Sequence, residues 1–210
     1  MKPFVKDLLN VPNCMSIARL LATPLLPYFW FTLDRPDITL AVGIVVGITD
    51  LFDGILARKL NQITELGAML DQLGDLVFEA TALLMAIVAN QMWMGWLVIY
   101  LFREFIVSTM RTWVMRNGGT LPSSWIGKAK SSLIQYGFFL FFTGVILLRS
   151  EFAPDIAPLA GVSPGRLILE AGCFSIYTGI FVGLLSAYHY GSAFVTFYSS
   201  HQNQDTSPRP

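Results

Sequence analysis

The chain has 210 residues, of which 54% are hydrophobic and only 13% are charged, whereas roughly a quarter of the residues of soluble domains carry charge. This composition disfavours a soluble globular domain and favours a membrane protein. Fourteen basic and fourteen acidic side chains cancel, so the chain has no bulk positive field of the kind that binds nucleic acid.

Six segments have about 20 mostly apolar residues, the length that a membrane-spanning helix needs. They are residues 13–32, 38–59, 66–89, 93–115, 128–148 and 167–190, and turn-forming sequences such as "DRPD" and "NGGTLPSS" separate them. Before them, "FVKDLL" predicts a short amphipathic helix on the membrane surface. We therefore expect an all-α integral membrane domain of six transmembrane helices with a short N-terminal interfacial helix over residues 1–195. We expect a polar, disordered tail over residues 196–210.

Basic residues are unevenly distributed between the two sides of this predicted bundle. Eight lie on the side of the termini: Lys2, Lys6, Arg58, Lys59, Arg116, Lys128, Lys130 and Arg209. Three lie on the other side: Arg35, Arg149 and Arg166. Because positive charge accumulates in cytoplasmic loops, both termini and the connection after the second segment are predicted to face the cytoplasm.

Four aspartates interrupt the second and third apolar segments. Asp50 and Asp53 are three residues apart, and Asp71 and Asp75 are four apart, so each pair lies on one helical face. A short hairpin would bring the two faces together. Converging carboxylates repel one another unless cations lie between them, and hard divalent cations such as Mg²⁺ or Mn²⁺ prefer oxygen ligands. The sequence therefore predicts a divalent metal site.

Small and basic residues accompany these aspartates. Gly54 and Gly67 remove side chains where a nucleotide or pyrophosphate would approach the backbone, and Arg58 can bind phosphate oxygens. Metals, a phosphate clamp and a spare carboxylate are the components of phosphoryl transfer. Acidic residues in membrane segments can also line a proton or ion pathway, so an acid-lined transporter is the alternative from another functional class.

The ordered pattern D-x2-D-G-x2-A-R-x8-G-x3-D-x3-D is complete in this chain. Its members are Asp50, Asp53, Gly54, Ala57, Arg58, Gly67, Asp71 and Asp75. The pattern resembles the signature of the CDP-alcohol phosphotransferase family, and the six-helix layout is similar as well. The resemblance implies an integral membrane enzyme, usually a homodimer, that transfers a phosphate-linked group from a CDP-linked donor to an alcohol and releases CMP.

The same resemblance assigns roles to these residues. The four aspartates would hold two divalent ions, Mg²⁺ or Mn²⁺, and Asp75 would also be the general base that takes the proton of the acceptor hydroxyl. The residues that would line the CDP site are Gly54, Ala57, Arg58 and Gly67. A lipid donor fits a membrane enzyme, because its acyl chains can stay in the bilayer while its head group reaches the metals.

Sequences outside the signature resemble the bacterial phosphatidylglycerophosphate synthases within this family. "NVPNCMSIARLLATPLLP" is similar to their N-x-P-N-x-x-[ST]-x-x-R opening, and "REFIVSTMR" to their R-E-x-x-V-x-x-x-R helix. This likeness implies donor-site contacts at Asn13, Ser16 and Arg19. The segment "SSWIGKAKSSLIQ" is similar to these synthases as well. Together with the "REFIVSTMR" helix, it implies contacts to an acceptor phosphate at Arg103, Arg111, Lys128 and Lys130. Leu76 is a departure, since many relatives have lysine there.

The basic residues have a second interpretation. Lys128 and Lys130 can be charges at a helix end that set the topology. Arg103 can pair with the adjacent Glu104 or with Glu79, which continues the helical face of the third-segment aspartates. These alternatives leave the acceptor site open.

We expect phosphatidyl transfer from CDP-diacylglycerol to glycerol 3-phosphate, a step of phospholipid biosynthesis. The alternative acceptors are inositol phosphate, phosphatidylglycerol or an amino alcohol. The resemblance further implies a multi-pass protein of the bacterial inner membrane that contacts membrane lipid and no nucleic acid. A homodimer is expected, and the GxxxG pair Gly179 and Gly183 could serve its interface.

Overall fold

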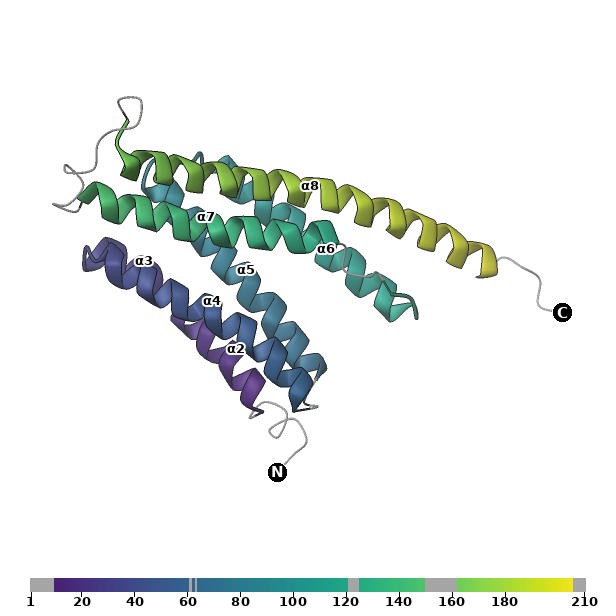
Figure 1. The fold of residues 1–210 in the computed structure, drawn as a ribbon. Coiled ribbons are helices and arrows are strands. Elements are labelled where there is room, and N and C mark those ends of the chain that lie inside the picture. The colour runs from purple at the N-terminus through teal and green to yellow at the C-terminus, as the bar shows by residue number, and fades with distance from the viewer. Residues whose placement is uncertain (1–9, 61, 63, 121–124, 150–161, 206–210) are drawn as a thin grey trace.

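The computed structural model describes residues 10–60, 62, 64–120, 125–149 and 162–205, and in this part of the chain it shows helices and no β-strand. Six long helical segments form the bundle in Figure 1. They correspond to the six predicted segments, which confirms the all-α fold class. The predicted interfacial helix, "FVKDLL", lies outside the described residues.

The first segment is a broken helix. It consists of α2 (Val11–Ala22), α3 (Leu25–Pro27) and the π-helix η1 (Tyr28–Thr32). Pro24 cannot donate to the helical ladder, and Thr23 closes α2 by donating from both its backbone N–H and its hydroxyl to the carbonyl of Arg19. The two prolines Pro24 and Pro27 thus divide the first membrane segment without ending it.

The next two segments form the predicted hairpin. Helix α4 (Pro36–Lys59) leads into α5 (Glu65–Val88), and α2 packs against both. Thr64 caps α5, because its hydroxyl accepts a hydrogen bond of 3.0 Å from the backbone N–H of Gly67. Helix α6 (Gly95–Arg116) then returns along the bundle and packs on α5 and α8.

The last two helices lie side by side in Figure 1 and pack together along glycines. They are α7 (Trp125–Arg149) and α8 (Pro164–Asp205). A Cβ on Gly172 would lie 2.5 Å from the backbone nitrogen of Phe141 and 2.8 Å from the carbonyl oxygen of Gly137. The backbones therefore approach more closely than side chains would permit. Gly179 and Gly183 also face α7, against Ile134 and Lys130, so the GxxxG pair packs within the chain.

Helix α8 is longer than the predicted segment 167–190. It continues to Asp205, through residues 196–205 of the tail that the sequence predicts to be disordered. Trp113 of α6 explains part of this length, because its ring packs against Phe194, Phe197 and Tyr198 of α8.

The helices suit a membrane to different degrees. Three described spans are long and apolar enough to cross it by composition: Val11–Thr32, Trp125–Arg149 and Pro164–Ser200. The remaining helices α4, α5 and α6 have 24, 24 and 22 residues, which is also sufficient length. They carry the acidic residues of the candidate site, together with Arg103 and Arg111.

Candidate active site

Three of the four predicted aspartates converge. Asp50 comes from α4, while Asp71 and Asp75 lie one turn apart on α5. One carboxylate oxygen from each lies within 4.8 Å of the other two. The side chains of Asp53, Gly54, Ala57 and Arg58 lie outside the described part of α4. The predicted hairpin geometry is therefore confirmed for the three described aspartates.

Arg19 lies among these carboxylates. Its guanidinium forms ion pairs with Asp50, with Asp71 at 3.0 Å and with Asp75 at 3.4 Å. It also donates to the backbone carbonyl of Asp71 at 3.1 Å. The side chain of Arg19 is only 2% exposed, so a buried helix α2 residue supplies the protein's own positive charge to the acidic cluster. The sequence places Arg19 at the donor site but gives no sign of this contact.

Gly74 makes room for the guanidinium. A Cβ at this position would lie 2.6 Å from one terminal nitrogen of Arg19 and 2.9 Å from its Cζ. These distances are shorter than real Cβ contacts, so any larger residue would move Arg19. Gly74 stands between Asp71 and Asp75 in the sequence but is not part of the recognised signature, and sequence analysis missed it.

Asn13 and Ser16, the other two predicted donor contacts, are buried in α2. Asn13 donates to the Thr64 hydroxyl at 3.2 Å, and its Oδ1 would be 2.5 Å from a Cβ on Gly67. The Ser16 hydroxyl donates to the carbonyl of Pro12 at 3.2 Å. Asn13 and Gly67 thus join the start of α2 to the start of α5, next to the acidic cluster.

A second charged cluster lies deeper in the bundle. Lys130 of α7 pairs with Glu79 of α5 at 2.9 Å and with Glu104 of α6 at 2.7 Å. Arg103 pairs with the adjacent Glu104 and donates to the carbonyl of Gly183 at 3.0 Å. Two acidic and two basic side chains therefore neutralise one another. Of the two partners predicted for Arg103, the structure shows Glu104, while Glu79 pairs with Lys130.

The remaining predicted phosphate contacts are less completely paired. Arg111 donates to the Tyr190 hydroxyl at 3.0 Å and lies over the ring of that tyrosine, but its Nε is buried without a described acceptor. Lys128 is exposed and forms no ion pair with a described residue. These two side chains retain hydrogen-bonding capacity for an anionic ligand.

The described part of the bundle contains two cavities, with volumes of about 390 Å³ and about 950 Å³. The larger connects the acidic cluster with the basic residues: its lining includes Arg19, Asp50, Asp71, Asp75, Glu79, Arg103, Arg111, Lys128 and Lys130. The three described aspartates of the predicted metal site and the predicted acceptor contacts therefore share one space. Its volume is within the range of small-molecule binding sites.

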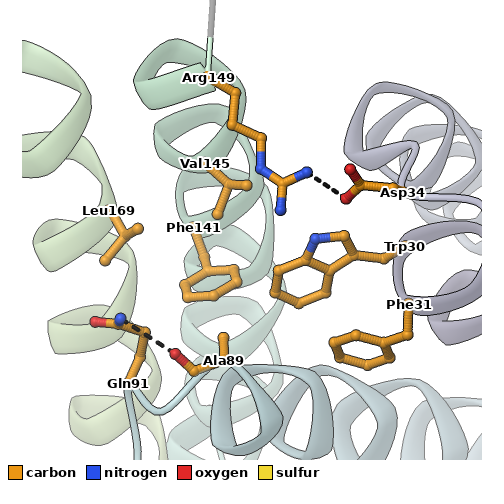
Figure 2. Close-up of a pocket in the computed structure, with 9 residues that line it drawn as sticks. All are labelled: Trp30, Phe31, Asp34, Ala89, Gln91, Phe141, Val145, Arg149 and Leu169. Carbon is orange, nitrogen blue, oxygen red and sulfur yellow. Dashed lines mark hydrogen bonds and ion pairs between the residues drawn. The ribbon is translucent and has the colours of Figure 1, made fainter.

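The smaller cavity lies apart from these residues. Figure 2 shows Arg149 facing Asp34 at its rim, with Trp30 and Phe141 beneath the pair. Its lining contains none of the aspartates of the acidic cluster. The chemistry suggested by the sequence therefore belongs to the larger cavity.

The acidic cluster fits a metal ion. Three carboxylates against one guanidinium leave two formal negative charges, the charge that one divalent cation neutralises. Carboxylate oxygens are the ligands that Mg²⁺ and Mn²⁺ prefer. Asp71 and Asp75 have side chains 53% and 44% exposed, so an ion and a phosphate ligand could reach them from the cavity.

Comparisons with known proteins agree with this geometry. A sequence model of the CDP-alcohol phosphatidyltransferase family matches residues 9–163. Proteins named CDP-diacylglycerol–glycerol-3-phosphate 3-phosphatidyltransferase are similar to this chain. The one from Salmonella typhimurium LT2 is 32% identical over 135 residues, which cover 59% of this chain and 71% of the relative. The one from Yersinia enterocolitica is 32% identical over 136 residues, with the same coverage.

The family model covers α2, the α4–α5 hairpin, α6 and α7, which carry most of the residues that line the larger cavity, while Tyr190 of α8 lies beyond it. They favour a transferase over an acid-lined transporter. The pattern of aspartates, their convergence and the family match lead to one conclusion: this chain belongs to the CDP-alcohol phosphatidyltransferase family.

Proposed function

We propose that this protein transfers the phosphatidyl group of CDP-diacylglycerol to glycerol 3-phosphate and releases CMP. The observation that supports the proposal most is the shared cavity, which places an acidic metal-type cluster and basic side chains around one space. The names of the relatives, which specify the same donor and acceptor, support it as well.

The proposed catalytic centre has two divalent ions, Mg²⁺ or Mn²⁺, held by Asp50, Asp53, Asp71 and Asp75. When bound, they would neutralise the pyrophosphate and stabilise the departing CMP. By the family resemblance, Asp75 accepts the proton of the attacking hydroxyl, and its place in the cavity lining beside Asp71 is consistent with that role. The oxygen of that hydroxyl forms the new bond to the phosphorus of the phosphatidyl group as the bond to CMP breaks.

Donor and acceptor bind to different parts of the cavity in this proposal. CDP lies at the end of the cavity that carries Arg19, next to the α4 residues Gly54, Ala57 and Arg58. Gly67, Asn13 and Ser16 are not among the described residues that line this cavity, and the space beside Gly67 holds the Asn13 side chain. These three predicted donor contacts therefore support the site from the start of α2 and of α5. The acceptor phosphate lies at Arg111, whose Nε has no described acceptor, and at Lys128, which forms no ion pair with a described residue; both side chains line the cavity. Arg103 and Lys130 are neutralised by acids of the protein, so they shape this region and contribute less to phosphate binding.

Purified protein with CDP-diacylglycerol and a panel of acceptors tests the reaction. CMP release should occur with glycerol 3-phosphate and not with inositol phosphate, phosphatidylglycerol or an amino alcohol, should stop with EDTA and should return with Mg²⁺ or Mn²⁺. Asp75→Asn should lose most turnover, roughly 100-fold or more for a general base. CMP release only with inositol phosphate, phosphatidylglycerol or an amino alcohol would refute the acceptor.

The cytoplasmic side of a bacterial inner membrane is the proposed location of the catalytic cavity. Lys59, Arg116 and Lys128 lie at helix ends on the side of the acidic cluster, consistent with the positive-inside bias. A homodimer is proposed from the family resemblance. Labelling of single cysteines in intact and opened cells tests the orientation, and light scattering in detergent tests the dimer.

A further inference from the structure

Glu79 is a buried acid in the larger cavity to which the family signature gives no role. It follows Asp71 and Asp75 at four-residue spacing, so all three lie on one face of α5. Glu79 is only 2% exposed. The aspartates are much more open, which distinguishes Glu79 from the metal-type cluster.

The two carboxylate oxygens of Glu79 have different surroundings. Oε2 accepts hydrogen bonds from the Tyr100 hydroxyl at 2.7 Å and from Lys130 Nζ at 2.9 Å. Oε1 is buried and accepts no hydrogen bond from any described residue. A buried carboxylate oxygen without a donor is costly. The fold holds one oxygen firmly and leaves the other without a described donor, in a residue that lines the cavity.

The charge around Glu79 indicates what kind of donor fits. Glu79 and Glu104 are balanced by Lys130 and Arg103, so this cluster has no net negative charge to attract an ammonium group. A neutral hydroxyl can satisfy Oε1 without disturbing that balance. The chemistry therefore favours a polyol over an amino alcohol.

We propose that Glu79 is a specificity residue whose Oε1 accepts a hydrogen bond from the non-reacting hydroxyl of a polyol phosphate. This inference rests on the proposed function. Asp75 and Glu79 are four residues apart, a rise of about 6 Å along a helix. Each hydrogen bond to a hydroxyl spans about 2.7 Å. Neighbouring hydroxyls of one acceptor can therefore reach Asp75 and Glu79 together, while its phosphate meets Arg111 and Lys128.

The test compares glycerol 3-phosphate with 3-hydroxypropyl phosphate, which lacks only the non-reacting hydroxyl. Wild-type protein with CDP-diacylglycerol should prefer glycerol 3-phosphate in kcat/KM by about 10- to 100-fold, the size of a hydrogen bond to a charged group. Glu79→Met should reduce this preference to within about threefold, mainly by raising KM for glycerol 3-phosphate. Glu79→Gln keeps the shape and a weaker acceptor, and it should give an intermediate preference.

Glu104→Gln is the matched control, because it removes the other carboxylate partner of Lys130. Its preference between the two acceptors should equal that of the wild type, whatever its absolute rate. If Glu79→Met does not fold, the acceptor preference of Glu79→Gln alone tests the inference. A preference unchanged in the folded Glu79 variants, or a wild type that does not discriminate, overturns the inference while CMP release still supports the proposed function. No CMP release from wild type with either acceptor overturns the proposed function itself.

Discussion

Arg19 is predicted to stabilise the metal-free protein by neutralising its acidic cluster. Arg19→Gln removes the positive charge from three carboxylates whose oxygens lie within 4.8 Å of one another. Removing one partner from a buried ion pair leaves the other charges uncompensated, which is the costly case. The variant should therefore be destabilised most when no divalent metal is present.

The exposure of the carboxylates determines how much stability Arg19→Gln loses. Opposite charges at 3.4 Å, the distance from Arg19 to Asp75, attract by about 4.9 kcal/mol at an effective dielectric constant of about 20, and by about 1.2 kcal/mol in water. The side chains of Asp50, Asp71 and Asp75 are 24%, 53% and 44% exposed, so solvent screens part of the attraction that the variant loses. We expect a loss of about 2 to 3 kcal/mol, which corresponds to a fall in Tm of about 4 to 12 °C for a chain of this size.

Thermal unfolding in detergent, with EDTA or with Mg²⁺, measures this effect. Mg²⁺ should narrow the difference in Tm between Arg19→Gln and wild type, because a bound cation replaces the missing charge. Arg35→Gln is the matched control: Arg35 pairs with Asp37 on the surface, where both side chains are more than half exposed, and its loss should lower Tm much less than the loss of Arg19. Equal Tm values for the two variants in EDTA, or a difference that Mg²⁺ leaves unchanged, would refute the reasoning.

Three further predictions concern packing and the two cavities. Gly172→Ala should lower Tm by several degrees because its Cβ would lie 2.5 Å from the backbone of α7, whereas Gly191→Ala, with no atom within 4 Å of the added Cβ, should not lower it. Lys128→Ala should raise KM for glycerol 3-phosphate about tenfold with little change in kcat, as initial rates would show; an unchanged KM favours a topology-setting lysine. Arg149→Gln should leave kcat/KM within twofold of wild type because Arg149 lines the smaller cavity, and a large loss would show that the two cavities are coupled.

Local patterns in the sequence were sufficient for the helices and the acidic motif. Apolar length predicts where each membrane segment lies, because a helix needs about 20 residues to cross the bilayer. Spacings of three and four residues place Asp71 and Asp75 on one face, because the helical repeat is local. The end of α8 differs from the expectation, since its final turns follow contacts with Trp113 of α6 that no local pattern contains.

The partners of the charged residues were decided by the tertiary structure alone. Arg19 meets carboxylates 31 to 56 positions away in the chain, and Lys130 chooses Glu79 and Glu104 on two other helices. Such pairings depend on how each helix is rotated and where it crosses its neighbours, which is set by packing of whole surfaces. The sequence determined which charges enter the membrane. The packing of the bundle determined which of them neutralise one another and which oxygen of Glu79 has no donor among the described residues.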